Sequence, residues 1–174
     1  MLYFAYGSNM CTGRLRRRVP SAIPLRTAKL LNHSFRFHKR SRKDSSGKGN
    51  ALFTGEPADV VWGVLFEIDA DEECKLDEAE GLGHGYCRQT VTVHDQEGNQ
   101  HRAFMYVAEE THIVPDLKPY TWYKYFVLEG ARQHGLPAEY VMQIEVMPAD
   151  EDPDRARDAE NRDIAALRTL TDLM

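Results

Sequence analysis

Two short stretches of the chain hold residue types that are able to do chemistry, and the first is Tyr6-Gly7-Ser8-Asn9. It follows an aromatic run and ends that run with small polar residues. Glycine lets a ligand approach the main chain closely and tolerates backbone conformations that other residues rarely adopt. If a helix begins just after this loop, its unpaired amides face the loop and favour an anion such as a carboxylate. Taken alone, a polar turn at the end of a strand explains these residues better than a ligand site does.

The second stretch is LDEAEG, residues 76–81, whose Glu80 falls in the last turn of an expected helix. The carbonyls exposed at a helix C-terminus disfavour a carboxylate there by about 0.3 kcal/mol or more. Such a position suits a general base that must later give its proton back. Glu78 points to the other side of the helix, so the two carboxylates are not expected to act as a pair. Taken alone, a solvated glutamate at a frayed helix end is again the simpler explanation.

The strands that position these stretches are predicted from hydrophobic patterning. Two segments are apolar on both faces, one alternates phenylalanine with charged residues, and two flank the hairpin turn QEGN. These five expected strands are residues 2–6, 60–68, 27–40, 86–95 and 100–108. The polar, glycine-containing stretch at 42–51 is expected to be a loop.

The helix that ends in Glu80 is expected to have Asp69 as its N-cap, with Glu72 completing a capping-box-like pattern, and to stop at Gly81. A short helix is expected near residues 11–18, with Asn9 or Thr12 as its cap. Two longer helices and a charged tail that becomes helical are expected further along the chain. They fall at residues 119–135, at 138–147 and from about residue 150.

Composition limits the class of protein. A chain of 174 residues with 42% hydrophobic residues fits one α+β domain over 1–174, with roughly five to seven strands. No apolar run approaches the roughly 20 residues that cross a bilayer, and no secretory signal is expected. The 3 cysteines lack a C-x-x-C pair, which indicates free thiols in a reducing cytoplasm. The 7 histidines show no ligand spacing, so no metal site is expected.

Charge is divided unevenly between the two parts of the chain. Residues 1–50 hold 12 Lys and Arg against a single acid, Asp44, whereas the remainder holds 10 basic and 26 acidic residues. Such asymmetry can mark an anion-binding half. Mutual neutralisation of the two halves in the folded protein is the favoured explanation.

Considered together, the two stretches become specific. YFAYGSN near the start, VWGVLFEI before a helix, LDEAEG at its end and GLPAEY later closely resemble the γ-glutamylcyclotransferase family, over about residues 2–142. The resemblance implies a small mixed β-barrel with flanking helices and a cavity at one end. It also implies that the α-amine of a γ-glutamyl compound attacks its own γ-carbonyl, which yields 5-oxoproline and a free amine or amino acid. Positioning and proton transfer are enough for this reaction, so no cofactor is implied.

The resemblance also carries site residues over to this chain. Glu80 matches the family's catalytic glutamate, which takes a proton from the α-amine and returns it to the leaving amine. Backbone amides of the loop would hold a carboxylate or carbonyl oxygen, and tyrosines would bind substrate while excluding water. For Tyr123, packing in the core is an equal alternative, and Tyr120 and Tyr125 lie nearby. The substrate-binding residues implied are Tyr3, Tyr6, Gly7, Ser8, Asn9, Met10, Tyr106 and Tyr123.

The implied partner is a small γ-glutamyl molecule, with neither nucleic acid nor membrane, and homodimer formation is left open. One alternative is an enzyme that cyclises γ-glutamylamines, which would share Glu80 and differ at the pocket rim. Another is a non-catalytic module that binds RNA or an acidic partner through RLRRR and HKRSRK, although a pI near 5.8 argues against it. If the basic stretch 36–48 borders the pocket, it favours an acidic or phosphorylated leaving group. A solvated hairpin is the favoured expectation for that stretch.

Overall fold

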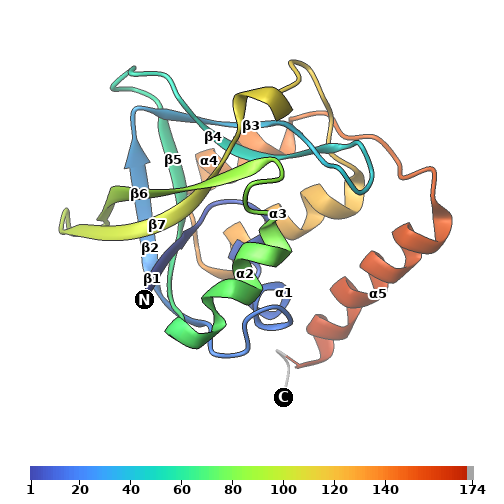
Figure 1. Cartoon of the computed structure of the whole chain (residues 1–174), viewed down its shortest axis with the longest axis horizontal. Coiled ribbons are helices and arrows are strands. Elements are labelled where there is room, and N and C mark those ends of the chain that lie inside the picture. The colour runs from blue at the N-terminus through green and yellow to red at the C-terminus, as the bar shows by residue number, and fades with distance from the viewer. Residues whose placement is uncertain (172–174) are drawn as a thin grey trace.

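The computed structural model describes residues 1–171 of the chain, with side chains over residues 1–164 (Figure 1). Its strands are β1 (Leu2–Ala5), β2 (Ile23–Leu31), β3 (His33–Arg40), β4 (Gly47–Phe53), β5 (Val60–Glu67), β6 (Tyr86–Asp95) and β7 (Gln100–Ala108). Its α-helices are α1 (Thr12–Arg16), α2 (Glu73–Glu80), α3 (Thr121–Gln133), α4 (Ala138–Glu145) and α5 (Arg155–Thr171). Figure 1 shows β3 and β4 in the upper part of the molecule, α1 and α2 in the lower part, and α5 along one flank.

Five strands form a closed barrel in the order β1-β5-β2-β6-β7. Neighbours pair antiparallel, except that β1 closes the barrel by pairing with β7 in parallel, with Tyr3 opposite Phe104. The apolar runs in β1 and β5 fit strands that are buried on both faces, and Phe4, Val64 and Phe66 are fully buried. The prediction of a mixed barrel with flanking helices is confirmed.

A second sheet of two strands, β3 and β4, corrects two predictions. The single strand expected over 27–40 is divided at Asn32, whose φ of 61° is left-handed, so that β2 stays in the barrel and β3 leaves it. The loop expected at 42–51 contains the start of β4. A Cβ on Gly47 would lie 2.4 Å from the Phe37 carbonyl oxygen, so this glycine marks a close approach of strands and not a loop.

The helix that carries Glu80 forms as expected at its end. Gly81 has a φ of 72° and caps α2 in the left-handed conformation that favours glycine. Its beginning differs, because Asp69 precedes a single 3-10 turn at Ala70–Glu72 and makes no side-chain cap bond. Glu72 accepts a hydrogen bond from the Ser21 amide at 2.9 Å instead of closing a capping box. The short helix α1 follows Cys11, so neither Asn9 nor Thr12 is its cap.

Helix α3 packs against the loop that follows β1. A Cβ on Gly130 would lie 2.4 Å from the Cys11 nitrogen and 2.5 Å from the Met10 carbonyl carbon, so only glycine permits this approach. The fully buried Met10 side chain belongs to this contact. No helix in the described part of the chain combines the length and the apolar character needed to cross a membrane.

Candidate active site

The loop after β1 and the C-terminal end of α2 meet in a polar cluster around Glu80. The Asn9 side-chain amide donates to Glu80 Oε1 at 2.9 Å and to the Tyr3 hydroxyl at 3.0 Å. Arg18 Nη1 donates to the same Glu80 oxygen at 2.5 Å and to Asn9 Oδ1 at 2.9 Å. The two stretches that the sequence marked are therefore in direct contact, although about 70 residues separate them.

Gly7 has no left-handed backbone, because its φ is −114°. Its ψ is −144°, so the backbone at this glycine is irregular without being left-handed. A Cβ added to it would meet only the Tyr123 hydroxyl, at 3.5 Å, so what the glycine leaves open is space beside that hydroxyl. The Met10 amide donates to the Gly7 carbonyl and the Cys11 amide to the Ser8 carbonyl. The amides of Ser8 and Asn9 have no acceptor among the described residues.

Most of the predicted site residues surround one small cavity, which we call the inner cavity. Its volume is about 20 Å³, which is room for about one water molecule. Met10 is absent from its lining, because this side chain packs in the core beneath α3. The lining residues are Tyr3, Tyr6, Gly7, Ser8, Asn9, Gly49, Glu80, Tyr86, Tyr106 and Tyr123.

Hydroxyl groups fix the tyrosine rings of the inner cavity in place. Tyr106 donates to Asp77 Oδ1 at 2.6 Å, and Tyr6 donates to the Tyr106 carbonyl oxygen. The Tyr123 hydroxyl accepts from the Gly49 amide at 3.0 Å, while Tyr86 donates to the Gly49 carbonyl at 2.6 Å. The position of Tyr123 is compatible with both substrate binding and core packing, since its ring is buried and also lines the inner cavity.

The hydroxyls of these tyrosines stay protonated at neutral pH. Burial raises the pKa of Tyr3, Tyr6 and Tyr86 well above the usual value near 10. Burial is also the largest influence on Tyr106, and the adjoining Asp77 carboxylate raises the pKa of that phenol further. The inner cavity is therefore walled by neutral hydroxyl groups, with Glu80 as its one carboxylate. Tyr6, Tyr86 and Tyr106 already donate their hydroxyl hydrogen to protein acceptors.

A second, larger space of about 360 Å³, the outer cavity, adjoins the inner one and shares Ser8, Glu80, Tyr86 and Tyr123 with it. Glu78 borders the outer cavity alone, whereas Glu80 lies at the boundary of the two. The cationic residues of the outer lining are Arg14, Arg18, Lys39, Arg42, Lys43 and Lys48.

The basic stretch 36–48 is not the solvated hairpin that we expected, because part of it borders the outer cavity. Lys39 on β3 is only 6% exposed. Lys48 on β4 pairs with Asp44 at 2.8 Å and lies 4.6 Å from the ring centroids of Trp122 and Tyr123. Burial lowers the pKa of Lys48 to about 8. The pairing of β3 with β4 turns these two lysines toward the cavity.

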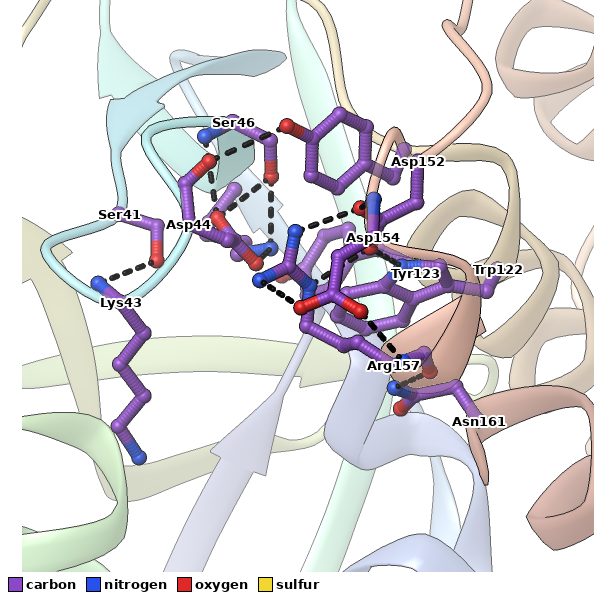
Figure 2. Close-up of polar contacts among 12 residues, drawn as sticks. Ser41, Lys43, Asp44, Ser46, Trp122, Tyr123, Asp152, Asp154, Arg157 and Asn161 are labelled. Atoms are coloured by element: carbon purple, nitrogen blue, oxygen red, sulfur yellow. Dashed lines mark hydrogen bonds and ion pairs between the residues drawn. The ribbon is translucent and has the colours of Figure 1, made fainter. Parts of the chain in front are cut away.

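The segment before α5 supports the same wall from behind, as Figure 2 shows for Trp122, Asp152 and Arg157. The Trp122 indole donates to Asp152 Oδ2 at 2.8 Å. Arg157, on α5, donates to both oxygens of the same carboxylate, at 2.7 and 2.5 Å. The Asp152 side chain has no exposed area, so a buried ion pair holds the start of α5 beside the outer cavity.

Several site residues were not identified from the sequence. Asp77 lies three residues before Glu80 within LDEAEG, and helical spacing places the two on neighbouring positions of one face. This i, i+3 spacing from Glu80 is the sequence signal that could have identified Asp77 as a site residue. Arg18 ends a run of arginines typical of a solvated surface, and Tyr86 begins a strand with no distinguishing pattern. Among the described residues, no three His, Cys, Asp or Glu side chains gather in a way that could hold a metal ion.

Comparison with known proteins identifies the family of this chain. A family model described as the AIG2-like family matches residues 60–144. The chain is 37% identical to gamma-glutamylcyclotransferase of Bos taurus over 146 residues, covering 82% of this chain and 76% of that protein. The chain belongs to the γ-glutamylcyclotransferase family. Its identity to the Homo sapiens protein of the same name is 34% over 149 residues, covering 84% of this chain and 78% of that protein.

The fold supports the same assignment. A solved structure named Gamma-glutamyl cyclotransferase matches with a TM-score of 0.80 and 29% sequence identity, covering 89% of this chain and 92% of that chain. The barrel with its second sheet and helices is therefore the fold of γ-glutamylcyclotransferases, and the chain is an enzyme of this type.

Proposed function

We propose that this γ-glutamylcyclotransferase converts a γ-glutamyl amino acid into 5-oxoproline and the free amino acid, with Glu80 as general base and then general acid. The observation that carries the proposal is the position of Glu80 at the boundary of the inner and outer cavities. Of the carboxylates that line either cavity, Glu80 alone lines both. An amide held at that boundary has its glutamyl part on one side and its leaving amine on the other.

Arg18 occupies the position beside Glu80 Oε1 that the substrate ammonium must take. A γ-glutamyl compound carries a protonated α-amine, which cannot attack until a base removes a proton. Glu80 Oε1 accepts from the Arg18 guanidinium and the Asn9 amide. The substrate ammonium replaces Arg18 at this oxygen, and Asn9 keeps the carboxylate oriented. Arg18 lines the outer cavity and bonds to the same Glu80 oxygen, so its guanidinium must move when the substrate ammonium takes that place.

Once Glu80 has taken a proton, the neutral α-amine attacks the γ-carbonyl carbon and closes a five-membered ring. The carbonyl oxygen gains negative charge in this step, and preorganised donors lower its energy. The amides of Ser8 and Asn9 are available for that oxygen or for the glutamyl carboxylate. The carbon–nitrogen bond to the leaving amine then breaks as Glu80 delivers its proton to the departing nitrogen. The ring nitrogen, which still carries two hydrogens, loses its second proton to the Glu80 carboxylate that this transfer regenerates.

Cations around the outer cavity support an amino acid as the leaving group in preference to a simple amine. A released amino acid carries an α-carboxylate, and the basic lining supplies its counter-charge. The same observation counts against the module that binds RNA, because Lys39 and Lys48 of the basic stretch face the cavity. The three cysteines form no disulfide, which supports a reducing, cytoplasmic location.

The function is tested with a panel of γ-glutamyl amino acids, γ-glutamylamines and glutathione, by measuring the 5-oxoproline formed. We expect turnover of γ-glutamyl amino acids in buffer treated with a chelator and without an added cofactor. Formation of 5-oxoproline from γ-glutamylamines alone would favour the alternative reaction. If the protein turns over none of these compounds and retains RNA at moderate salt, the proposal is wrong.

A further inference from the structure

We infer that the outer cavity binds a leaving group that carries two carboxylates, one held by Arg14 and the other by Lys39. The inference rests on the proposed function and names the substrate class of that enzyme, a γ-glutamyl dicarboxylic amino acid. Its basis is a buried lysine and a half-buried arginine that form no ion pair within the described part of the chain. The two lie on different walls of the same space.

The outer cavity is where the leaving group must lie. It begins at Glu80, Ser8 and Tyr123, which it shares with the inner cavity. If the glutamyl group occupies the inner side and Glu80 protonates the departing nitrogen, the rest of the leaving molecule extends into the outer cavity. A volume of about 360 Å³ accommodates an amino acid of any size.

Positive charge exceeds negative charge around this space. Against six Lys and Arg side chains, the lining holds three carboxylates, Asp44, Glu78 and Glu80. Asp44 is already paired with Lys48, and Glu80 with Arg18. The excess therefore falls on the remaining cations, of which Arg14 and Lys39 are the most buried.

Lys39 has little access to solvent, and the carboxylates that attract it, Glu80, Asp44 and Glu109, act from beyond ion-pair distance. Its residue is 6% exposed, and no carboxylate of the described residues lies within ion-pair distance. Its Nζ lies 4.4 Å from the centroid of the Tyr86 ring, and burial lowers the pKa of this lysine. A Cβ on Gly85 would lie 3.0 Å from the same Nζ, so a glycine leaves room for the ammonium group. Burying an unpaired ammonium is costly, and an anion arriving in the cavity would offset that cost.

Arg14, which packs against α3, likewise forms no ion pair within the described part of the chain. Its guanidinium lies 4.5 Å from the Phe126 ring centroid, and its Nε is buried with no hydrogen-bond partner in the described part of the chain. Burial, and then the neighbouring Arg18, lower the pKa of Arg14 to about 10. Guanidinium groups bind carboxylates through two parallel hydrogen bonds, so a carboxylate is the anion that this site favours.

Two separate cations select for the number and spacing of charges on the leaving group. Arg14 packs on α3, whereas Lys39 packs on Tyr86 and Gly85 at the start of β6. Glutamate and aspartate carry an α-carboxylate and a side-chain carboxylate and can occupy both places. Glutamine and alanine fill only one of them, and the ε-linked γ-glutamyl derivative of lysine adds an ammonium group next to two cations.

The test compares kcat/KM for γ-glutamyl-glutamate, γ-glutamyl-glutamine and γ-glutamyl-alanine at low ionic strength. We expect kcat/KM for the glutamate compound to be at least ten times that for the isosteric glutamine compound, mainly because its KM is lower. The side-chain carboxylate forms a charge-assisted hydrogen bond that the glutamine amide cannot form. Of Lys39→Met and Arg14→Met, the variant that removes the partner of the side-chain carboxylate should reduce that ratio about tenfold. The other variant should lower kcat/KM for all three compounds alike. Arg40→Gln, at an exposed position of the same strand as Lys39, should leave the ratio unchanged.

The outcomes separate this inference from the proposed function. Equal kcat/KM for the glutamate and glutamine compounds in the wild-type protein would overturn the inference and leave the function standing. So would a ratio that Lys39→Met and Arg14→Met leave intact in folded variants, as judged by circular dichroism. No 5-oxoproline from any γ-glutamyl compound would overturn the proposed function, and the inference with it.

Discussion

Arg18 Nη1 lies 2.5 Å from Glu80 Oε1, and Asn9 bonds to both side chains. The pair joins α2 to the residues that follow α1, and it keeps Glu80 beside a cation in the absence of substrate. At the C-terminal end of a helix a carboxylate is disfavoured, and the guanidinium opposes that effect. The contact therefore stabilises the position of Glu80 while obstructing the site that a substrate ammonium has to reach.

Replacing Arg18 tests this obstruction. We expect Arg18→Ala to lower KM for a γ-glutamyl amino acid severalfold, because the substrate ammonium then meets no competing cation at Glu80. Steady-state kinetics measure the effect, and Arg17→Ala, at an exposed neighbouring position, is the matched control. A tenfold or larger fall in kcat/KM would show that Arg18 assists the reaction instead of obstructing it.

The hydrogen bond of 2.6 Å between Tyr106 and Asp77 joins β7 to the helix that carries Glu80. Hydrogen bonds to charged groups contribute about 1.5–3 kcal/mol, so Tyr106→Phe should lower the free energy of unfolding by about 2 kcal/mol. Denaturant unfolding of Tyr106→Phe, Asp77→Ala and the double variant measures the coupling between the two side chains. A coupling energy near zero would mean that the bond does not hold α2 in place.

Asp44 should make stability depend on pH in the acidic range. Although burial acts to raise it, hydrogen bonds from Lys48 and Ser46 lower the pKa of Asp44 to about 2, below its usual 3.8. A carboxyl group with a lowered pKa stabilises the fold above its unfolded pKa, and this contribution is lost as pH falls from about 4 toward 2. We expect Asp44→Asn to lose about 2 kcal/mol of unfolding free energy at pH 7 and much less at pH 2.5.

Denaturant unfolding at the two pH values gives both numbers. Asp71→Asn, at an exposed position, serves as the control and should behave as the wild type at both. An equal loss for Asp44→Asn at pH 7 and pH 2.5 would show that the carboxylate charge plays no part.

The sequence was sufficient for the elements with strong local signals. The apolar runs of β1 and β5, the hairpin of β6 and β7, and the left-handed Gly81 all follow from local patterns. The contact between Glu80 and the loop after β1 followed from family resemblance, since no local pattern encodes a contact across 71 positions.

The parts that could not be predicted depend on distant partners. The division of β2 from β3 rests on one left-handed residue, Asn32, inside a pattern that otherwise continues. Gly47 was interpreted as a loop residue from its local sequence. Its actual role, a tight contact with the backbone of Phe37 and of Lys118, depends on segments that the local sequence does not reveal. Lys39 and Arg14 resembled solvated charges, and only the folded protein places them on Tyr86 and Phe126.

The most direct test of the account is the formation of 5-oxoproline by Glu80→Gln, with Glu78→Gln as the matched control on the same helix. We expect Glu80→Gln to lose at least a hundredfold in kcat while still binding the γ-glutamyl substrate in calorimetry, since a general base contributes about 10²–10⁴ in rate. Glu78→Gln should keep near wild-type kcat. Wild-type turnover by Glu80→Gln, or loss of turnover in Glu78→Gln instead, would contradict the assignment of Glu80 as the base.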